Sequence, residues 1–225
     1  MKSLFNLMFD YAYKRELVDR NYARAFEVGR EIKEQRQKEK RENYIFSAEE
    51  IQKLWDNVGN VRFAAMVLVG VYSGWRPQEL AVLKLDGVDL EGRTFKGGMK
   101  TAAGIGRTVP IHKDVFPLVE SYYREAEGMG SEFLFNDPDG QQGTHLTYDK
   151  YRGRFNKVMS RLGMEYYHLH ETRHTWYTAA KRSHMDDVLR DRMMGHQNES
   201  YDVKKLYDHQ TMEDMKAAMD RVSFL

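Results

Sequence analysis

The chain contains no cysteine, which excludes disulfide bonds and thiolate metal ligands and makes a cytosolic location the best fit. It also lacks any apolar run that approaches the roughly 20 residues of a membrane-spanning helix. The N-terminal stretch MKSLFNLMFDYAYK is interrupted by Asp10 and is followed by no small-residue cleavage site, so we expect no signal peptide. With 41% apolar residues among 225, the composition favours a soluble globular protein with one ordinary core.

A strong net charge is missing as well. The formal net charge is only +1, whereas nucleic-acid-binding proteins are often far more basic, so any such role depends on where the charges lie. The segment KYRGRFNKVMSR contains five basic residues and no acidic one, and we expect them to form a nucleic-acid-binding face: Lys150, Arg152, Arg154, Lys157 and Arg161. A solvated helix surface is the alternative, although such surfaces usually mix both signs.

Helical periodicity dominates the first half of the chain. Residues 1 to about 43 are predicted to be helical, first as an amphipathic segment and then as a charge-rich exposed helix or linker. At Ser47 the sequence SAEE offers a capping box with Glu50, so we expect a new domain to begin there. Apolar residues then recur at helical spacing through IQKLWDNV and FAAMVLVGVY.

The period changes between Val88 and Ile111. Glycines in LEGRTFKGG and AAGIGRTVPI separate short strands there and predict a small sheet or hairpins. Helices are expected to resume at 113–126, 147–162, 171–183, 186–194, near 201–207 and at 211–221. In the last of these, Thr211 and Asp214 form a capping pair. The predicted class is therefore mainly α with a small β insert (α+β).

The segment HLHETRH contains three histidines, a glutamate and an arginine within seven residues, so it is a candidate functional site. Its second half matches the H-E-x-x-H pattern of helical zinc sites, with His170 and His174 at i and i+4. The best-known extension of that pattern places a glycine and a histidine where this chain has Tyr177 and Ala180. In addition, Arg173 lies within the motif and would place a positive charge close to the zinc ion. A zinc hydrolase is therefore a remote alternative.

The same letters allow a second interpretation, in which His170 and Arg173 face a phosphate from one turn of a helix. In SGWRPQEL, Arg76 directly precedes Pro77, which favours the first turn of a helix, so this arginine is expected at a helix N-terminus, where anions are stabilised. Two planar guanidinium groups can hold the two non-bridging oxygens of one phosphodiester. Taken singly, each arginine is better explained as a surface ion pair, so the interpretation depends on their combination.

Five short motifs provide that combination. SGWRPQEL, GGMK, HETRH, MGHQ and LYDHQ follow one another along the chain, with helices and the β insert between them. In this order they resemble the tyrosine recombinases, the phage-integrase type of site-specific recombinase. The resemblance implies a helical remnant of a core-binding domain plus linker at 1–45 and a catalytic domain at 46–225 that includes a C-terminal helix at 211–221. We therefore expect a catalytic-domain fragment. The family's usual leucine before the glycine–histidine pair is Met194 here, a change of similar volume.

The resemblance also assigns roles to individual residues. The implied catalytic set is Arg76, Lys100, His170, Arg173, His196 and Tyr207. Glu79 matches the family's acidic position, and His174 is expected to pack behind the site or support it without direct contact. Two plainer interpretations stay open: Lys100 as a solvated turn residue and His196 as a donor at a helix C-terminus.

The expected chemistry follows from the side chains. A phenol with a pKa near 10 needs a base or a positive field to attack a phosphodiester at neutral pH, and His170 with the two arginines would supply these. Lys100 would give a proton to the leaving 5′-oxygen. Guanidinium groups would neutralise the developing charge, so no metal and no cofactor is expected.

Together these features imply a site-specific DNA recombinase that cleaves and rejoins strands through a 3′-phosphotyrosyl intermediate, as the integrase of a mobile element or phage would. The expected partners are double-stranded DNA and further copies of the chain, in a homo-tetramer on paired DNA sites. The C-terminal helix would dock on a neighbouring copy through Met212, Met215 and Met219. The alternatives are a type IB topoisomerase-like enzyme without strand exchange and a DNA-binding module that has lost catalysis.

Overall fold

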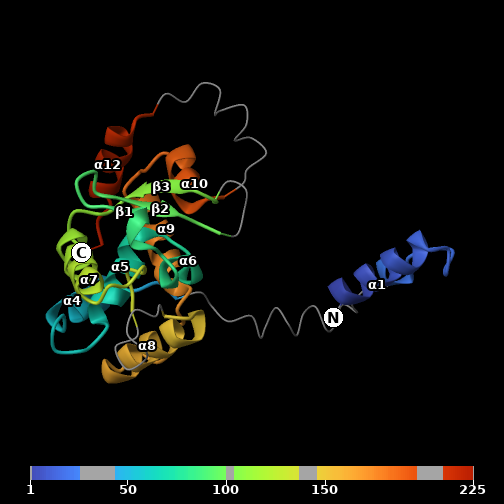
Figure 1. Ribbon diagram of the computed structural model, residues 1–225, viewed down its shortest axis with the longest axis horizontal. Coiled ribbons are helices and arrows are strands. Elements are labelled where there is room, and N and C mark those ends of the chain that lie inside the picture. Colours follow the sequence, from blue (N-terminus) through green and yellow to red (C-terminus); the bar gives the residue numbers. More distant parts are fainter. Residues whose placement is uncertain (1, 26–43, 100–103, 137–145, 197–209, 225) are drawn as a thin grey trace. The chain divides into compact units, whose positions relative to one another are not determined.

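The structure is a computed structural model that describes residues 2–25, 44–99, 104–136, 146–196 and 210–224 (Figure 1). The chain divides into two compact units, Met1–Glu42 and Asn43–Leu225. Among the described residues, none of the helices combines the length and the apolarity that crossing a bilayer demands.

The first unit is not one continuous helix. It contains α1 (Lys2–Lys14) and the short α2 (Tyr22–Ala25). The prediction of unbroken helix is wrong between them, where the chain turns and Glu16 adopts a φ of 56°. The turn is held by Asn21, whose amide donates to Asp10 Oδ1 at 2.8 Å and whose oxygen accepts from the Ala23 N–H at 2.9 Å. An asparagine that caps a helix start in this way competes with helix continuation.

The second unit is mainly helical, as predicted. Its helices are α4 (Ala48–Asp56), α5 (Ala64–Ser73), α6 (Pro77–Ala81), α7 (Phe116–Gly128), α8 (Tyr148–Arg161), α9 (Glu171–Arg182), α10 (Asp187–Met194) and α12 (Met212–Asp220), with a 3₁₀ turn η1 (Leu85–Gly87). The predicted capping box at Ser47 is confirmed, because its hydroxyl accepts from the Glu50 N–H while the Glu50 carboxylate accepts from the Ser47 N–H. The capping pair of Thr211 and Asp214 is confirmed in the same way at α12.

Helix α7 begins at Phe116 rather than at Lys113 as predicted. The reason is that polar groups outside the helix engage the preceding backbone. Asp220 Oδ1 accepts from the Lys113 N–H at 3.0 Å, and His112 Nδ1 accepts from the Asp114 N–H at 3.2 Å. These residues are therefore held in a turn.

The predicted β insert is a three-stranded antiparallel sheet. Its strands are β1 (Val88–Asp89), β2 (Thr94–Gly97) and β3 (Arg107–Pro110), in the order β1-β2-β3. Phe95 on β2 pairs with Val109 on β3, and both side chains are fully buried. Helices α10 and α12 lie beside this sheet, and α8 lies apart from it in the same unit (Figure 1).

Helix α5 lies at the centre of the core. Nine of its ten residues are buried, consistent with its almost uninterrupted apolar sequence. The helix packs on α9, and its C-cap glycine, Gly74, has a φ of 66° and lies so close to Trp176 that an added Cβ would come within 2.5 Å of the indole ring. A side chain at this position would push apart the two segments that carry Arg76 and Arg173.

The methionine face of α12 is buried within its own unit. Met215 and Met219 are fully buried beside β3, and Asp220 forms an ion pair with Arg93 at 2.6 Å. Docking of this face on a second copy would therefore require α12 to leave the sheet of its own chain.

Candidate active site

Arg76 occupies the N-cap of α6, with Pro77 at the first helical position, as the sequence predicted. Its backbone is extended, with φ −70° and ψ 135°. The Glu79 carboxylate reaches back and accepts from the Arg76 N–H at 3.3 Å. This local arrangement fixes the backbone of Arg76 and so the direction in which its side chain starts.

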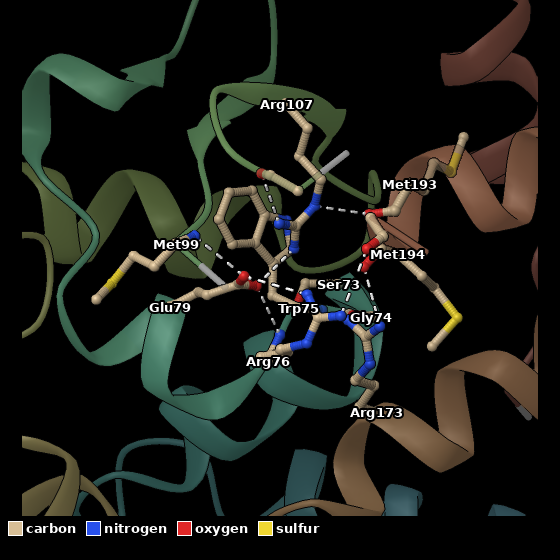
Figure 2. Close-up of polar contacts among 12 residues, drawn as sticks. Ser73, Gly74, Trp75, Arg76, Glu79, Met99, Arg107, Arg173, Met193 and Met194 are labelled. Carbon is tan, nitrogen blue, oxygen red and sulfur yellow. Dashed lines mark hydrogen bonds and ion pairs between the residues drawn. The ribbon is translucent and has the colours of Figure 1, made fainter. Parts of the chain in front are cut away.

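One carboxylate serves two arginines. Glu79 Oε1 lies 3.2 Å from Arg76 Nη1, and Glu79 Oε2 lies 2.7 Å from Arg107 Nη2 (Figure 2). Burial alone would raise the pKa of Glu79, but the hydrogen bond and charge of Arg107, assisted by the Met99 N–H and the charge of Arg76, lower it overall. Glu79 is therefore a buried anion whose stronger partner is Arg107.

Arg173 enters the same region from α9. Its side chain is buried, and Nη1 donates to the Gly74 carbonyl at 2.7 Å while Nη2 donates to the Met194 carbonyl at 2.9 Å (Figure 2). Burial, followed by the positive charges of Arg76 and Arg107, lowers the pKa of Arg173 to about 9. The group still carries its charge at neutral pH.

Three consecutive carbonyls at the end of α10 each accept from a different arginine. Arg107 Nε donates to Met193 O at 3.0 Å, Arg173 Nη2 to Met194 O at 2.9 Å, and Arg76 Nη2 to Gly195 O at 3.4 Å. The last carbonyls of a helix have no partner within the helix and carry the negative end of its dipole, so they attract cations. The C-terminus of α10 thus gathers arginines from α6, β3 and α9.

His196 follows this segment directly. Its Nε2 lies 2.9 Å from Arg173 Nη2, and its Nδ1 lies 3.2 Å from Asp191 Oδ1. Burial and the charge of Arg173 lower the pKa of His196, although Asp191 acts in the opposite direction. The imidazole is therefore neutral at pH 7, and the simple helix C-cap role does not account for its side-chain contacts.

The zinc interpretation of HETRH is not supported by the position of its glutamate. Glu171 is buried and its carboxylate accepts from the His168 N–H, at the start of its own helix. His170 is exposed and His174 half-buried, with ring centroids 5.5 Å apart. Within the described ranges, no group of three histidine, aspartate or glutamate side chains is placed to hold a metal ion.

The remaining predicted residues are placed as follows. Lys100 and Tyr207, and with them the helix expected near 201–207, lie outside the described residues. The five basic residues of the predicted nucleic-acid-binding face all lie on α8. Among them, Arg152 pairs with Asp149 at 2.9 Å, and the Arg154 guanidinium lies 5.5 Å from the Phe63 ring centroid. Their role in binding stays a prediction.

Sequence reasoning missed Arg107. Its side chain is only 4% exposed, and its guanidinium lies 4.1 Å from the Trp75 ring centroid. The available signal was an arginine inside the strand segment RTVPI, where a residue of that size and charge needs a partner once it is buried. Nothing in the pattern identified Glu79 as that partner.

Comparisons with known proteins bear on the family and on the fold. The model of the phage integrase family matches residues 44–214. Among solved structures, the integrase from mycobacterium phage Brujita is 20% identical over 99% of this chain and 70% of its own, with a TM-score of 0.62. The Tn1549 transposon integrase in complex with circular intermediate DNA is 17% identical over 97% of this chain and 76% of its own, with a TM-score of 0.68.

A third structure, a lambda integrase dimer bound to a core site, is 17% identical over 88% of this chain and 70% of its own, with a TM-score of 0.61. At such identities the structural likeness shows the fold. A search among curated proteins gives no match.

Proposed function

Because the chain belongs to the phage integrase family, the tyrosine recombinases that carry out site-specific DNA recombination, we propose that its arginine cluster binds the scissile phosphate of a DNA strand and that Tyr207 attacks it. The observation that carries the proposal is the convergence of Arg76, Arg173 and His196 from three separate elements. Arg76 and Arg173 carry positive charge there, and the buried carboxylate of Glu79 is shared between Arg76 and Arg107.

The cluster retains donors for an anion. A guanidinium has five N–H groups, and the contacts with described residues use two of them in Arg76 and three in Arg173. Charge-assisted hydrogen bonds from such groups to non-bridging oxygens become stronger as negative charge develops in the transition state.

The proposed reaction conserves the energy of the phosphodiester bond. The Tyr207 oxygen attacks phosphorus, its proton passes to His170, and the bond to the 5′-oxygen breaks as Lys100 protonates that oxygen. The product is a 3′-phosphotyrosyl link and a free 5′-hydroxyl. A 5′-hydroxyl from a partner strand then attacks the link and releases the tyrosine, so neither ATP nor a metal ion enters the scheme.

The same proposal includes the assembly. Double-stranded DNA is the substrate, with the α8 basic residues among its contacts, and four copies act on paired sites in the cytoplasm. Exchange of α12 between copies would join them, which requires its release from β3. The helical segment at 1–45 is assigned to the end of a core-binding domain, and 46–225 to the catalytic domain. These assignments derive from the family resemblance.

Covalent capture tests this function even though the target sequence is undefined. The protein is incubated with a pool of randomised duplexes carrying nicks, so that the cleaved end diffuses away and the adduct accumulates. A protease-sensitive adduct on a denaturing gel is the expected result, and sequencing the captured DNA defines the duplex for kinetics. Transfer of the captured strand to an added 5′-hydroxyl strand separates recombination from simple relaxation. Absence of any adduct across the pool would contradict the proposal.

A further inference from the structure

Arg107 differs from Arg76 and Arg173 in how its side-chain nitrogens are used. All three of its side-chain nitrogens donate: Nε to Met193 O at 3.0 Å, Nη1 to Gly104 O at 3.1 Å and Nη2 to Glu79 Oε2 at 2.7 Å (Figure 2). The central carbon of the guanidinium also lies over the Trp75 ring, 4.1 Å from its centroid. Every side-chain nitrogen of Arg107 thus already has an acceptor in the protein, whereas the interactions among the described residues occupy only the two Nη atoms of Arg76 and of Arg173.

The surrounding backbone is shaped to fit this side chain. Gly98 has a φ of 107°, and a Cβ there would come within 1.8 Å of Gly104 O and 2.5 Å of Arg107 Nη1. Gly195 has a φ of 66°, and a Cβ there would lie 2.8 Å from Gly104 Cα and 3.3 Å from Arg107 Cδ. Arg107 thus lies between the base of the β2–β3 hairpin and the end of α10, where only glycine allows such close approach.

The charge arrangement gives Arg107 a specific effect on Arg76. Glu79 is 2% exposed, so its carboxylate needs a cationic partner. Arg107 supplies the shorter contact, at 2.7 Å against 3.2 Å for Arg76. If Arg107 were absent, Arg76 would be the remaining cation in contact with this carboxylate among the described residues, and would be drawn fully onto it. A guanidinium drawn more closely onto a buried carboxylate has fewer donors and less positive potential left to stabilise a phosphate.

We propose that Arg107 is a positioning residue for strand cleavage: by holding Glu79 and the Met193 carbonyl, it leaves Arg76 available to the scissile phosphate and ties the hairpin base to α10. The inference rests on the proposed function and concerns the same site. Arg107 acts on the reaction through Arg76, without contact with the DNA.

The test measures single-turnover adduct formation on the captured duplex. Arg107→Met should slow cleavage at saturating DNA by on the order of a hundredfold, the usual effect of withdrawing one charge-stabilising donor. Its DNA affinity should change by less than about threefold, because phosphate contacts elsewhere dominate binding. Arg107→Lys keeps a cation beside Glu79 but loses the planar fork, so its cleavage rate should be at least about fivefold higher than that of Arg107→Met. Equal loss in both variants would overturn the inference.

A second change, Glu79→Gln, distinguishes a positioning role of Arg107 from general damage to the fold. In an Arg107→Met, Glu79→Gln protein no carboxylate draws Arg76 away, so the double variant should cleave at least tenfold faster than Arg107→Met alone. It leaves no buried carboxylate without its main cation, so it should fold even if the single variant does not. It is then compared with Glu79→Gln, from which its cleavage rate should differ by less than about fivefold. Additive losses in the two changes would overturn the inference.

A matched control removes another paired arginine of the sheet region. Arg93, bonded to Asp220 at 2.6 Å, contacts neither Glu79 nor the end of α10 in any interaction found among the described residues. Arg93→Met should lower stability while changing the cleavage rate by less than about threefold. A loss as large as that of Arg107→Met would show that any weakening of this region slows cleavage, against the inference.

A readout without DNA separates this inference from the proposed function. The side-chain ¹⁵N resonance of Arg76, assigned by its loss in Arg76→Lys, should shift in Arg107→Met and return in the double variant with Glu79→Gln. If the wild-type protein forms no adduct, the proposed function fails while this measurement still decides whether Arg107 controls Arg76. An Arg76 resonance that is unchanged by Arg107→Met would overturn the inference.

Discussion

Arg173 and His196 contact each other through their side chains, with Arg173 Nη2 2.9 Å from His196 Nε2. A guanidinium can only donate, so Nε2 must accept and the imidazole proton must reside on Nδ1, where Asp191 Oδ1 lies 3.2 Å away. The contact therefore defines the tautomer of the histidine before DNA binds. A phosphate that takes over this donor of Arg173 would release Nε2 for a new partner.

The nucleophile is the first prediction. Tyr207 lies eleven residues after His196, enough for a turn and a short helix, whereas Tyr201 lies only five residues after it. We expect Tyr207→Phe to abolish the covalent adduct and keep DNA binding, and Tyr201→Phe, the matched control, to keep adduct formation. Denaturing gels measure the adduct and fluorescence anisotropy the binding. An adduct that persists in Tyr207→Phe and disappears in Tyr201→Phe would reverse the assignment.

Lys100 provides the second prediction. If it protonates the leaving 5′-oxygen, Lys100→Ala should slow cleavage by roughly a hundredfold or more and leave DNA affinity nearly unchanged. A 5′-bridging phosphorothioate has a leaving group that needs no proton, so it should restore the rate of the variant. Failure of this rescue in single-turnover assays would reassign Lys100 to DNA contact.

The third prediction concerns metal. Because Glu171 binds the backbone of its own helix start, HETRH should hold no zinc. We expect cleavage to proceed at an unchanged rate in the presence of a strong chelator, and elemental analysis of the purified protein to find no stoichiometric metal. One tightly held zinc per chain would contradict the assignment of this motif to phosphate chemistry.

Helix α12 gives a stability prediction. Met215 is fully buried, so Met215→Ala should lower the free energy of unfolding by about 2–5 kcal/mol, the usual cost of such a cavity. Met212 is only partly buried and serves as the matched control, with a smaller expected loss. Urea denaturation of dilute protein measures both. Equal, negligible losses would mean that α12 does not pack on its own sheet in solution.

His112 determines a pH prediction. Burial lowers its pKa, opposed by Asp114, and its Nε2 lies 3.1 Å from Val222 O. The unfolded chain takes up the proton at a pKa near 6.5, so the stability linked to this neutral histidine is present above that pH and is lost as the pH falls toward the lowered folded-state pKa. His112→Gln should reduce the fall in Tm between pH 7.5 and 5.5. An unchanged dependence of Tm on pH would contradict this role of His112.

Much of this arrangement could be predicted because it has a local sequence signature. Ser47 with Glu50, and Arg76 before Pro77, mark helix starts through nearest neighbours, and the structure places both as expected. Arg107 could not be predicted, because its role depends on a carboxylate 28 positions away. The break after α1 was missed for the same reason, since Asn21 acts on Asp10 across a turn.

The three main-chain carbonyls at the end of α10 determine which sequence changes this segment can tolerate. Met193, Met194 and Gly195 bind their arginines through the main chain, so the side chains of the two methionines can change without removing an acceptor. Methionine in place of the family's leucine at 194 is one such exchange. The course of the backbone must be kept, and it depends on Gly195, which ends the helix with left-handed backbone angles. An insertion or deletion of one residue here would shift every acceptor relative to its arginine, and would be far more damaging than any replacement of similar size.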